Sequence, residues 1–522
     1  MNGAESMLET LINNGVEVCF SNPGTSEMHM VAAIGKTPGM RSILSLFEGV
    51  CSGAADGYGR MTGKPACTLL HLGPGLSNAS ANLHNAFKAN SPVINLIGDH
   101  ATYHKKYNAP LNSDVIGLAQ PISHWVRSVA DAQSLPFDAA DAVVAANVKP
   151  GQIATLIIPA DCAWNNSAAP VGKREMPSAL RVQDEAVKTA AQLLGNGKTT
   201  ILLMSNLALS ERCIELADQV SQATGAKIFC DTFTTRIARG EGRCPIERLG
   251  YFAEQATVQI KDAEQLIMIG TKAPVGFFAY PGKASEFYAE GSRLHTLAEV
   301  SEDAEDALQK LVDELDAGNL ILRRQPLSKP GLASGSLSPE TVARAITELM
   351  PTDAIVVDES ATAGFLIYPL SETAEPHDWL SLTGGSIGYG LPTSVGAAVA
   401  CPDRKVICLH GDGGAMYTIQ ALWTMARENL DICVVIFANR KYQILQIELA
   451  RVGAQSMNKK TLDMLDLSNP DLDFVKMAEG MGVKARRATT AEEFNNLFAA
   501  AMTEQGPMLI ETMLDVDAPP IG

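Results

Sequence analysis

The stretch from Lys405 to Lys441 constrains the fold of this chain more than any other. It reads KVICLHGDGGAMYTIQALWTMARENLDICVVIFANRK. Two apolar runs of strand length, Val406 to Leu409 and Ile432 to Phe437, enclose a segment with apolar residues at helical spacing. Strands that are apolar throughout and joined by a helix are typical of a parallel sheet covered on both faces. We therefore expect an α/β protein.

A glycine-rich turn follows the first of these strands. Gly411, Asp412, Gly413 and Gly414 come directly after it, and Asn439 follows the second strand, 27 residues beyond Asp412. Open α/β sheets bind ligands at the carboxyl ends of their strands, and glycine lets backbone N–H groups approach a phosphate. Oxygen ligands suit a Mg²⁺ ion that bridges a diphosphate. An Asp-Gly turn alone is common, but this combination predicts a diphosphate and Mg²⁺ site.

These segments resemble the thiamine-diphosphate (ThDP) enzymes of the acetolactate synthase, pyruvate oxidase and benzoylformate decarboxylase group. The ThDP-Mg motif of that group begins Gly-Asp-Gly and closes with an Asn pair. Here the pair is Ala438-Asn439, which keeps the position of the metal ligand. The resemblance implies Asp412, Asn439 and the backbone carbonyl of Lys441 as Mg²⁺ ligands. The further cofactor-binding residues that it implies in this region are Gly411, Gly413, Gly414 and Tyr442.

Composition and charge exclude several classes of protein. The 522 residues, 46% hydrophobic and 19% charged, are typical of a globular protein with roughly two to four domains. A net charge of −17, without a run of Lys or Arg, argues against a nucleic-acid partner. Ten scattered cysteines without a CxxC pair favour reduced thiols and a cytoplasmic location. No apolar run approaches membrane-spanning length, so we expect no membrane partner.

Strand and helix patterns alternate in three blocks, which two polar linkers separate. Residues 165–185 are rich in Pro, Ser and Ala, and residues 322–338 form a second such run. We expect domains at 1–165, 185–322 and 338–522, each a doubly wound parallel sheet. The resembled family has this plan, with a pyrimidine-binding domain, a central domain and a diphosphate-binding domain. Its FAD site depends on scattered contacts in the central domain, so FAD stays an open question here.

Glu48 is the second candidate site, where an apolar strand, Ser42 to Phe47, meets a helix of small residues. A carboxylate in that position is most often an N-cap. The segment LFEGVCSGAADGYGRMTGKPA resembles the one whose glutamate hydrogen-bonds N1′ of the aminopyrimidine and so favours the 4′-imino tautomer, which deprotonates C2 of the thiazolium. Such acid–base work benefits from a carboxyl pKa that burial shifts, and we expect Glu48 to be poorly hydrated.

Two shorter segments resemble cofactor contacts in the third block. In LTGGSIGYGLP, Gly385 aligns with the residue whose carbonyl receives the 4′-amino group. Ile387 aligns with the apolar residue that bends the cofactor into a V, although core packing would explain it equally well. In VVDESATAG, Ala361 and Thr362 resemble a diphosphate-contacting pair, and an ordinary helix N-cap is the alternative.

Candidates for the substrate end lie in the first block. SNPGTSE and LLHLGPGLSNA resemble the segments that border C2, which makes Thr25 and His71 catalytic candidates. A lone His at a strand end is more often structural. In YQILQIELARVG, Glu448 lies where the family lines its substrate pocket. It either binds a cationic or polyhydroxyl substrate or is an exposed helix charge, and we favour the exposed charge.

These features predict a ThDP- and Mg²⁺-dependent enzyme that decarboxylates a 2-oxo acid, joins it to an aldehyde or a second 2-oxo acid, or does both. The chain has Phe277 and Phe278 where benzoylformate decarboxylase has a second active-site histidine, so the choice between that activity and an acetolactate synthase-like one stays open. The family builds each active site between two subunits. We therefore expect at least a homodimer, and a homotetramer is the usual form.

Two alternatives come from other functional classes. Glycine-rich turns after strands also suit an NAD-dependent dehydrogenase, but no GxGxxG turn is followed by an acidic residue about twenty positions on. A catalytically inactive structural paralogue is the second alternative. The presence of Glu48, Asp412 and Asn439 together argues against it.

Overall fold

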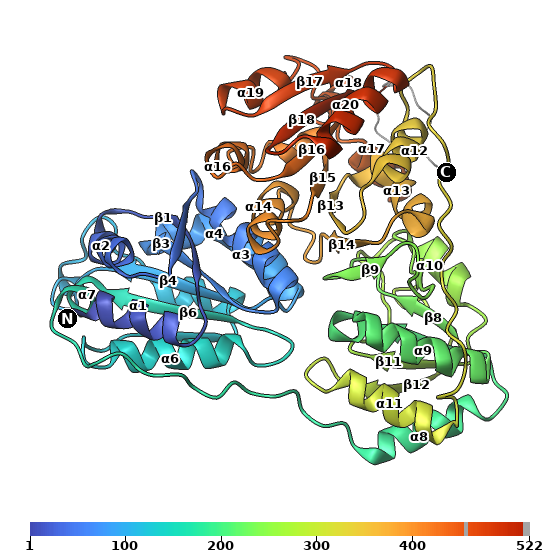
Figure 1. Ribbon diagram of the computed structural model, residues 1–522, viewed down its shortest axis with the longest axis horizontal. Helices are drawn as coiled ribbons and strands as arrows, with labels where there is room; N and C mark the ends of the chain where they lie inside the picture. Colours follow the sequence, from blue (N-terminus) through green and yellow to red (C-terminus); the bar gives the residue numbers. More distant parts are fainter. Residues whose placement is uncertain (454–457, 515–522) are drawn as a thin grey trace.

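Three sheets, each with its own helices, make up the computed structural model, which describes residues 1–453 and 458–514. Figure 1 shows the first sheet in blue and cyan, the middle one in green and yellow, and the third in orange and red. The α/β class expected from the sequence is confirmed. No helix in the described ranges is both long and apolar enough to cross a membrane.

The first sheet has six parallel strands in the order β2-β1-β3-β4-β6-β5. Two of these strands, β4 and β6, are buried along their whole length, as in a sheet that is covered on both faces. The strands are β1 (Val18–Asn22), β2 (Arg41–Leu44), β3 (Ala66–His71), β4 (Val93–Asp99), β5 (Trp125–Ser128) and β6 (Ile153–Pro159). The helices are α1 (Gly3–Asn13), α2 (Met28–Lys36), α3 (Glu48–Thr62), α4 (Leu72–Lys88), α5 (Val115–Ala119), α6 (Leu135–Ala146) and α7 (Ala160–Trp164).

The middle sheet has five parallel strands in the order β10-β8-β7-β11-β12. The strands are β7 (Thr200–Met204), β8 (Lys227–Cys230), β10 (Glu247–Arg248), β11 (Gln265–Ile269) and β12 (Arg293–Ala298). The helices are α8 (Asp184–Leu194), α9 (Glu211–Thr224), α10 (Ala253–Ile260) and α11 (Ala304–Glu314).

The third sheet has seven strands in the order β17-β18-β16-β15-β13-β14-β9, and β9 (Ile237–Arg239) is antiparallel to its neighbour. The other strands are β13 (Ala354–Glu359), β14 (His377–Ser381), β15 (Val406–Gly411), β16 (Ile432–Ala438), β17 (Lys484–Ala488) and β18 (Met508–Met513). The helices are α12 (Pro339–Leu349), α13 (Ile367–Leu370), α14 (Gly390–Ala400), α15 (Asp412–Ala415), α16 (Ala421–Arg427), α17 (Gln443–Arg451), α18 (Lys459–Asp463), α19 (Phe474–Gly480) and α20 (Ala491–Thr503).

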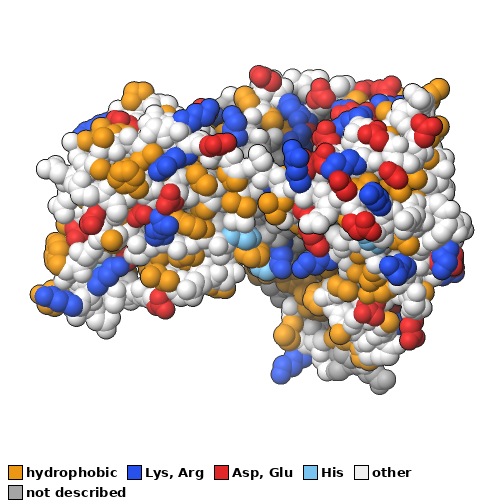
Figure 2. Space-filling view, turned by 90° about the horizontal axis from the view of Figure 1, so that it is seen from below, with side chains coloured by type: hydrophobic (Ala, Val, Ile, Leu, Met, Phe, Trp, Pro, Cys, Tyr) orange, Lys and Arg blue, Asp and Glu red, His pale blue; other side chains and the backbone are white. Residues whose placement is uncertain are grey.

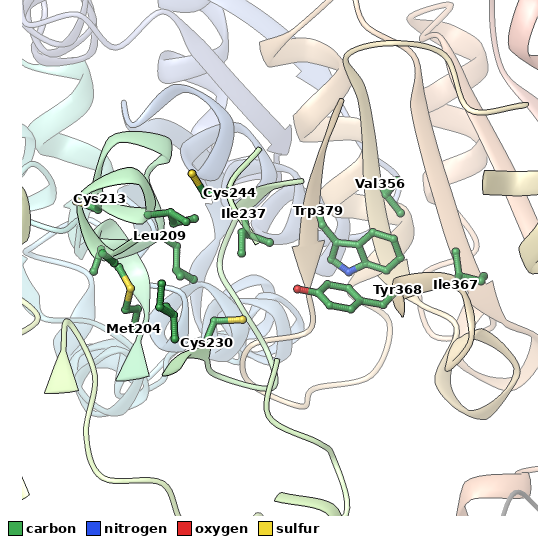
Figure 3. Close-up of a cluster of buried hydrophobic side chains, with 14 of the residues drawn as sticks. Met204, Leu209, Cys213, Cys230, Ile237, Cys244, Val356, Ile367, Tyr368 and Trp379 are labelled. Atoms are coloured by element: carbon green, nitrogen blue, oxygen red, sulfur yellow. The ribbon is translucent and has the colours of Figure 1, made fainter. Parts of the chain in front are cut away.

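Strand β9 joins the middle segment of the chain to the third sheet. It lies in the middle block of the sequence, yet Ile237 pairs with Trp379 of β14. Figure 3 shows the resulting continuous core, with Cys230 and Ile237 on one side and Tyr368 and Trp379 on the other. The third sheet is therefore mixed, and a proposed domain division at 185–322 and 338–522 has to allow for this shared strand.

Two helices made of small residues hold the first and third sheets together. A Cβ at Gly57 of α3 would lie 2.2 Å from the carbonyl oxygen of Thr393, and one at Gly396 of α14 would lie 1.9 Å from that of Ala54. Only glycine permits backbones to approach this closely. The buried Arg60 of α3 then donates hydrogen bonds to Asp56 and to the carbonyl oxygen of Ser381.

The surface carries no single dominant charge in the view from below. Figure 2 shows Lys and Arg side chains interspersed with Asp and Glu over that face, with apolar side chains between them.

Candidate functional site

Glu48 and His71 are neighbours at the carboxyl edge of the first sheet. Glu48 is the first residue of α3, and His71 ends β3. A Cβ at Gly75 would lie 3.5 Å from both the Oε1 atom of Glu48 and the Cβ of His71. Glu48 is half-buried and accepts a hydrogen bond of 3.0 Å from the side chain of Asn78. It is therefore more hydrated than the sequence indicated.

Glu27 holds His71 in place, which the sequence did not reveal. Its carboxylate is fully buried, and Oε2 lies 2.9 Å from Nδ1 of His71. The same carboxylate accepts hydrogen bonds from the backbone N–H of Gly24 and the hydroxyl of Ser26, both at 2.7 Å. A Cβ at Gly24 would collide with the imidazole at 2.3 Å, so glycine is needed there. Thr25, in the same turn, has its side chain exposed to solvent.

Asp412 is the buried carboxylate of the third sheet. It begins α15 directly after β15 and is 5% exposed. Oδ2 accepts the backbone N–H of Arg440 at 2.6 Å, and Oδ1 accepts that of Gly413 at 2.8 Å. Burial raises the pKa of the Asp412 carboxyl, although these N–H groups act in the opposite direction. A cation at this carboxylate would offset the cost of burial.

A chain of hydrogen bonds joins three of the predicted cofactor-binding residues, Thr362, Asn439 and Lys441. The side-chain Nδ2 of Asn439 donates to Oε1 of Gln443 at 3.1 Å, and the hydroxyl of Thr362 donates to the same oxygen at 3.3 Å. The Oδ1 atom of Asn439 accepts the backbone N–H of Lys441 at 3.2 Å. Gln443 therefore ties the Asn439 turn to the Thr362 turn. Sequence reasoning missed it, because its role depends on a contact across 81 residues.

The glycines after β15 form a cradle that a side chain would fill. A Cβ at Gly413 would lie 2.3 Å from the ring of Tyr442, and one at Gly414 would lie 3.3 Å from Ile387. Ile387 itself is 43% exposed, so it stands at the edge of the cradle and not in the core. Gly385, two residues before it, is exposed and has a positive φ of 70°. Gly411, which ends β15, is half-buried and extended.

Backbone strain is concentrated at these turns. Among the described residues, the only left-handed residues other than Gly, Asn and Asp are Leu72, Ala361 and Arg440, with φ of 50°, 48° and 57°. Leu72 follows His71, Ala361 is itself a predicted cofactor residue, and Arg440 follows Asn439. Strained backbone of this kind clusters at functional sites. Its position therefore supports a site at each sheet edge.

The donor set at Asp412 fits a magnesium ion that also contacts a diphosphate. Carboxylate, carboxamide and backbone carbonyl oxygens are hard ligands, and substrate phosphates complete a Mg²⁺ sphere in proteins. No cluster of three or more His, Cys, Asp or Glu arranged to hold a metal occurs in the described parts of the chain. A metal here would thus be bound by one protein carboxylate together with neutral oxygens.

The Glu48 group lies at the edge of the first sheet, and the Asp412 group lies at the edge of the third sheet. No hydrogen bond joins Glu48, His71 or Thr25 to Asp412 or Asn439 in the described structure. The contact between the first and third sheets runs instead through α3, α4 and α14. For example, Asn85 of α4 donates to the carbonyl oxygen of Ser386 at 2.8 Å.

Glu448 is not the exposed helix charge that the sequence favoured. Its side chain is 17% exposed, and Oε2 accepts a hydrogen bond of 2.6 Å from the hydroxyl of Tyr280. Arg451, one turn further along α17, pairs with Glu254 at 2.7 Å and stacks on the rings of Phe252 and Tyr280. Glu448 therefore belongs to a network that joins α17 to the middle segment.

Comparison with known proteins identifies both site-bearing segments. Residues 1–121 match the N-terminal thiamine pyrophosphate (the same compound as ThDP) binding domain of thiamine pyrophosphate enzymes, and residues 363–512 match the C-terminal one. A Mycobacterium tuberculosis protein assigned by name as an acetolactate synthase large subunit (IlvX) is 50% identical, over 98% of this chain and 99% of its own. Benzoylformate decarboxylase of Pseudomonas aeruginosa is 29% identical, over 96% and 97%.

A solved structure shows the same fold. The benzoylformate decarboxylase of Polynucleobacter necessarius superimposes with a TM-score of 0.86 over 100% of both chains, at 22% identity. The arrangement of three sheets is thus shared across the whole length of the chain.

Proposed function

The chain belongs to the family of thiamine-diphosphate enzymes that includes acetolactate synthases and benzoylformate decarboxylases; on this premise we propose that it is a ThDP- and Mg²⁺-dependent enzyme that acts on a 2-oxo acid. The substrate would lose CO₂, and the remaining fragment would be released as an aldehyde or joined to an aldehyde or a second 2-oxo acid. The observation that carries the proposal is the buried Asp412 carboxylate beside the Gly413 cradle.

The third-sheet residues would hold the cofactor. Asp412, Asn439 and the carbonyl of Lys441 would bind Mg²⁺, and the backbone N–H groups of Gly413 and Gly414 would face the diphosphate. The cofactor-binding set on this sheet also includes Gly411, Tyr442, Ala361, Thr362, Gly385 and Ile387. The NAD-dependent dehydrogenase alternative is set aside, because both matched segments are thiamine pyrophosphate-binding domains.

The first-sheet residues would move protons. ThDP supplies a thiazolium ring that accepts the electron pair when CO₂ leaves. Glu48 would exchange a proton with the aminopyrimidine of the cofactor, since it is half-buried at a sheet edge that faces ligands. Nδ1 of His71 lies 2.9 Å from the Glu27 carboxylate, and an N–H donated to that carboxylate would leave Nε2 to hold or give a proton at the substrate. The exposed hydroxyl of Thr25 would contact the substrate.

Two copies of the chain would complete each site. Among the described residues of one chain, no hydrogen bond joins Glu48, His71 or Thr25 to Asp412 or Asn439. Exposed site residues such as Ile387 and Thr25 leave room for a partner. We propose a homodimer as the minimum and a homotetramer as the assembly, in the cytoplasm. FAD in the central domain is tested by the absorbance of the purified protein between about 350 and 500 nm, where a bound flavin is coloured.

A panel of 2-oxo acids tests the function. The purified protein is incubated with ThDP and Mg²⁺, and both CO₂ and 2-hydroxyketone products are measured. We expect CO₂ from at least one 2-oxo acid, dependent on both cofactors, and the second product separates carboligation from simple decarboxylation. No CO₂ from any 2-oxo acid, despite bound ThDP, would favour the inactive paralogue instead.

A further inference from the structure

A buried carboxylate–imidazole pair lies next to the glycine cradle that follows β15. Glu359 ends β13, and His410 lies in β15 just before Gly411; the two residues are direct partners in the parallel register of these strands. The Oε2 atom of Glu359 is 2.9 Å from Nε2 of His410, and their side chains are 4% and 0% exposed. No step proposed above uses either residue.

Both nitrogens of the His410 ring face acceptors. Nδ1 lies 3.1 Å from the carbonyl oxygen of Gly411, and Nε2 faces the Glu359 carboxylate. The Glu359 carboxylate and the His410 ring therefore lie in direct contact, out of reach of solvent.

Glu359 also accepts hydrogen bonds from the turn that carries Ile387. Its Oε1 atom accepts the backbone N–H of Gly388, and Oε2 accepts that of Gly390, both at 2.6 Å. Short hydrogen bonds from N–H groups to a carboxylate are among the stronger ones in proteins. One side chain therefore fixes two backbone groups on either side of Tyr389.

His410 packs between that turn and the cradle. A Cβ at Gly390 would lie 2.8 Å from its Cδ2 atom, and a Cβ at Gly414 would lie 3.0 Å from its Cε1 atom. The same Cβ position at Gly414 is 3.3 Å from Ile387. The His410 ring therefore lies between the Ile387 turn and the Gly414 turn and keeps them apart.

We propose that Glu359 and His410 are positioning residues that set the distance between the Ile387 turn and the diphosphate cradle. They act through Gly388, Gly390 and Gly414 and do not touch the cofactor themselves. The inference rests on the proposed function, because that function gives the two turns one ligand in common. A displacement of about 1 Å at such a site can cost about a hundredfold in rate.

Glu359→Gln tests the role, with Glu511→Gln as a matched control. Gln keeps the shape of the side chain but replaces one acceptor with an NH₂ group, which cannot accept an N–H. Glu511 is an equally buried carboxylate of the same sheet, in β18, where it pairs with Arg487 at 2.8 Å. Both variants lose one buried charge, and only Glu359→Gln alters the Ile387 turn.

The first readout needs no cofactor. Hydrogen–deuterium exchange of peptide 382–391 is measured in the cofactor-free protein, and we expect it to be at least about tenfold faster in Glu359→Gln and unchanged in Glu511→Gln. The second readout is the exchange rate of the C2 proton of bound ThDP, which we expect to fall about tenfold or more in Glu359→Gln alone. Equal behaviour of the two variants in either readout overturns the inference.

Two further outcomes keep the test decisive. If Glu359→Gln does not fold, His410→Gln replaces it, since this variant leaves the contacts of Glu359 with Gly388 and Gly390 in place. We expect a smaller change in the same direction, and a result equal to Glu511→Gln overturns the inference. Failure of the wild-type protein to bind ThDP would refute the proposed function, whereas the peptide exchange would still report on the two glycine contacts.

Discussion

Replacing Gly413 with Ala tests the cradle directly. The new Cβ would lie 2.3 Å and 2.9 Å from two ring atoms of Tyr442 and 3.0 Å from a methyl of Leu467. Ordinary carbon contacts are about 3.5–4.0 Å, so the ring has to move by about 1 Å. Overpacking of this kind costs about 1–3 kcal/mol. Because the cradle must be intact to bind the diphosphate, we expect ThDP affinity to fall about tenfold to a hundredfold.

Calorimetric titration of the cofactor-free protein with ThDP, at saturating Mg²⁺, measures this loss. The control is Gly480→Ala, which makes the same chemical change in the same part of the fold with nothing within 4 Å of the new Cβ. It should bind ThDP as the wild type does. Wild-type affinity in Gly413→Ala would refute the cradle.

Three further predictions concern metal binding, acid stability and assembly. Asp412→Ala should fail to retain ThDP at micromolar Mg²⁺ in calorimetry, and unchanged affinity would place the metal elsewhere. Burial lowers the pKa of His377 to about 4. The ring is therefore neutral in the folded protein. Its contribution to the free energy of unfolding is complete above about pH 6.5 and is lost as the pH falls toward 4. Denaturant unfolding of wild type and His377→Asn should show their stability difference changing by on the order of 3 kcal/mol between pH 7 and pH 4; a constant difference would contradict the buried neutral ring. Co-expressed Glu48→Gln and Asp412→Ala chains should regain about a quarter of wild-type activity if each site uses two chains, and none if it uses one.

Buried strands were the most predictable part of the fold. The apolar runs expected as strands at Val406–Leu409 and Ile432–Phe437 become β15 (Val406–Gly411) and β16 (Ile432–Ala438), which begin at the same residues. A strand that is buried on both faces needs a continuous apolar run, and such a run is visible in the sequence alone. Strand β9, Ile237–Arg239, was not predicted, because three residues are too few to show a period and the pairing with β14 is tertiary.

The site residues, too, were predictable where their role depends on local sequence and not where it depends on a distant partner. Asp412 and Asn439 were visible because strand ends, glycines and spacing are local features of the sequence. Glu27 could not be assigned, since its role depends on His71, 44 residues away. Glu448 was misjudged because its partner Tyr280 is 168 residues away. Long-range partners of this kind decide whether a charge is exposed or buried, and a single sequence does not display them.

The central claim is that Glu48 of the first sheet and Asp412, beside the glycine cradle of the third sheet, act on one bound ThDP. Its most direct measurement is the exchange rate of the C2 proton of bound ThDP, in saturating Mg²⁺ and without substrate, for wild type and Glu48→Gln. We predict that the C2 proton of ThDP exchanges much faster in the wild type than in free ThDP. In a Glu48→Gln variant that still binds ThDP, we predict exchange near the rate of free ThDP. Equal exchange rates in the two proteins would contradict the account.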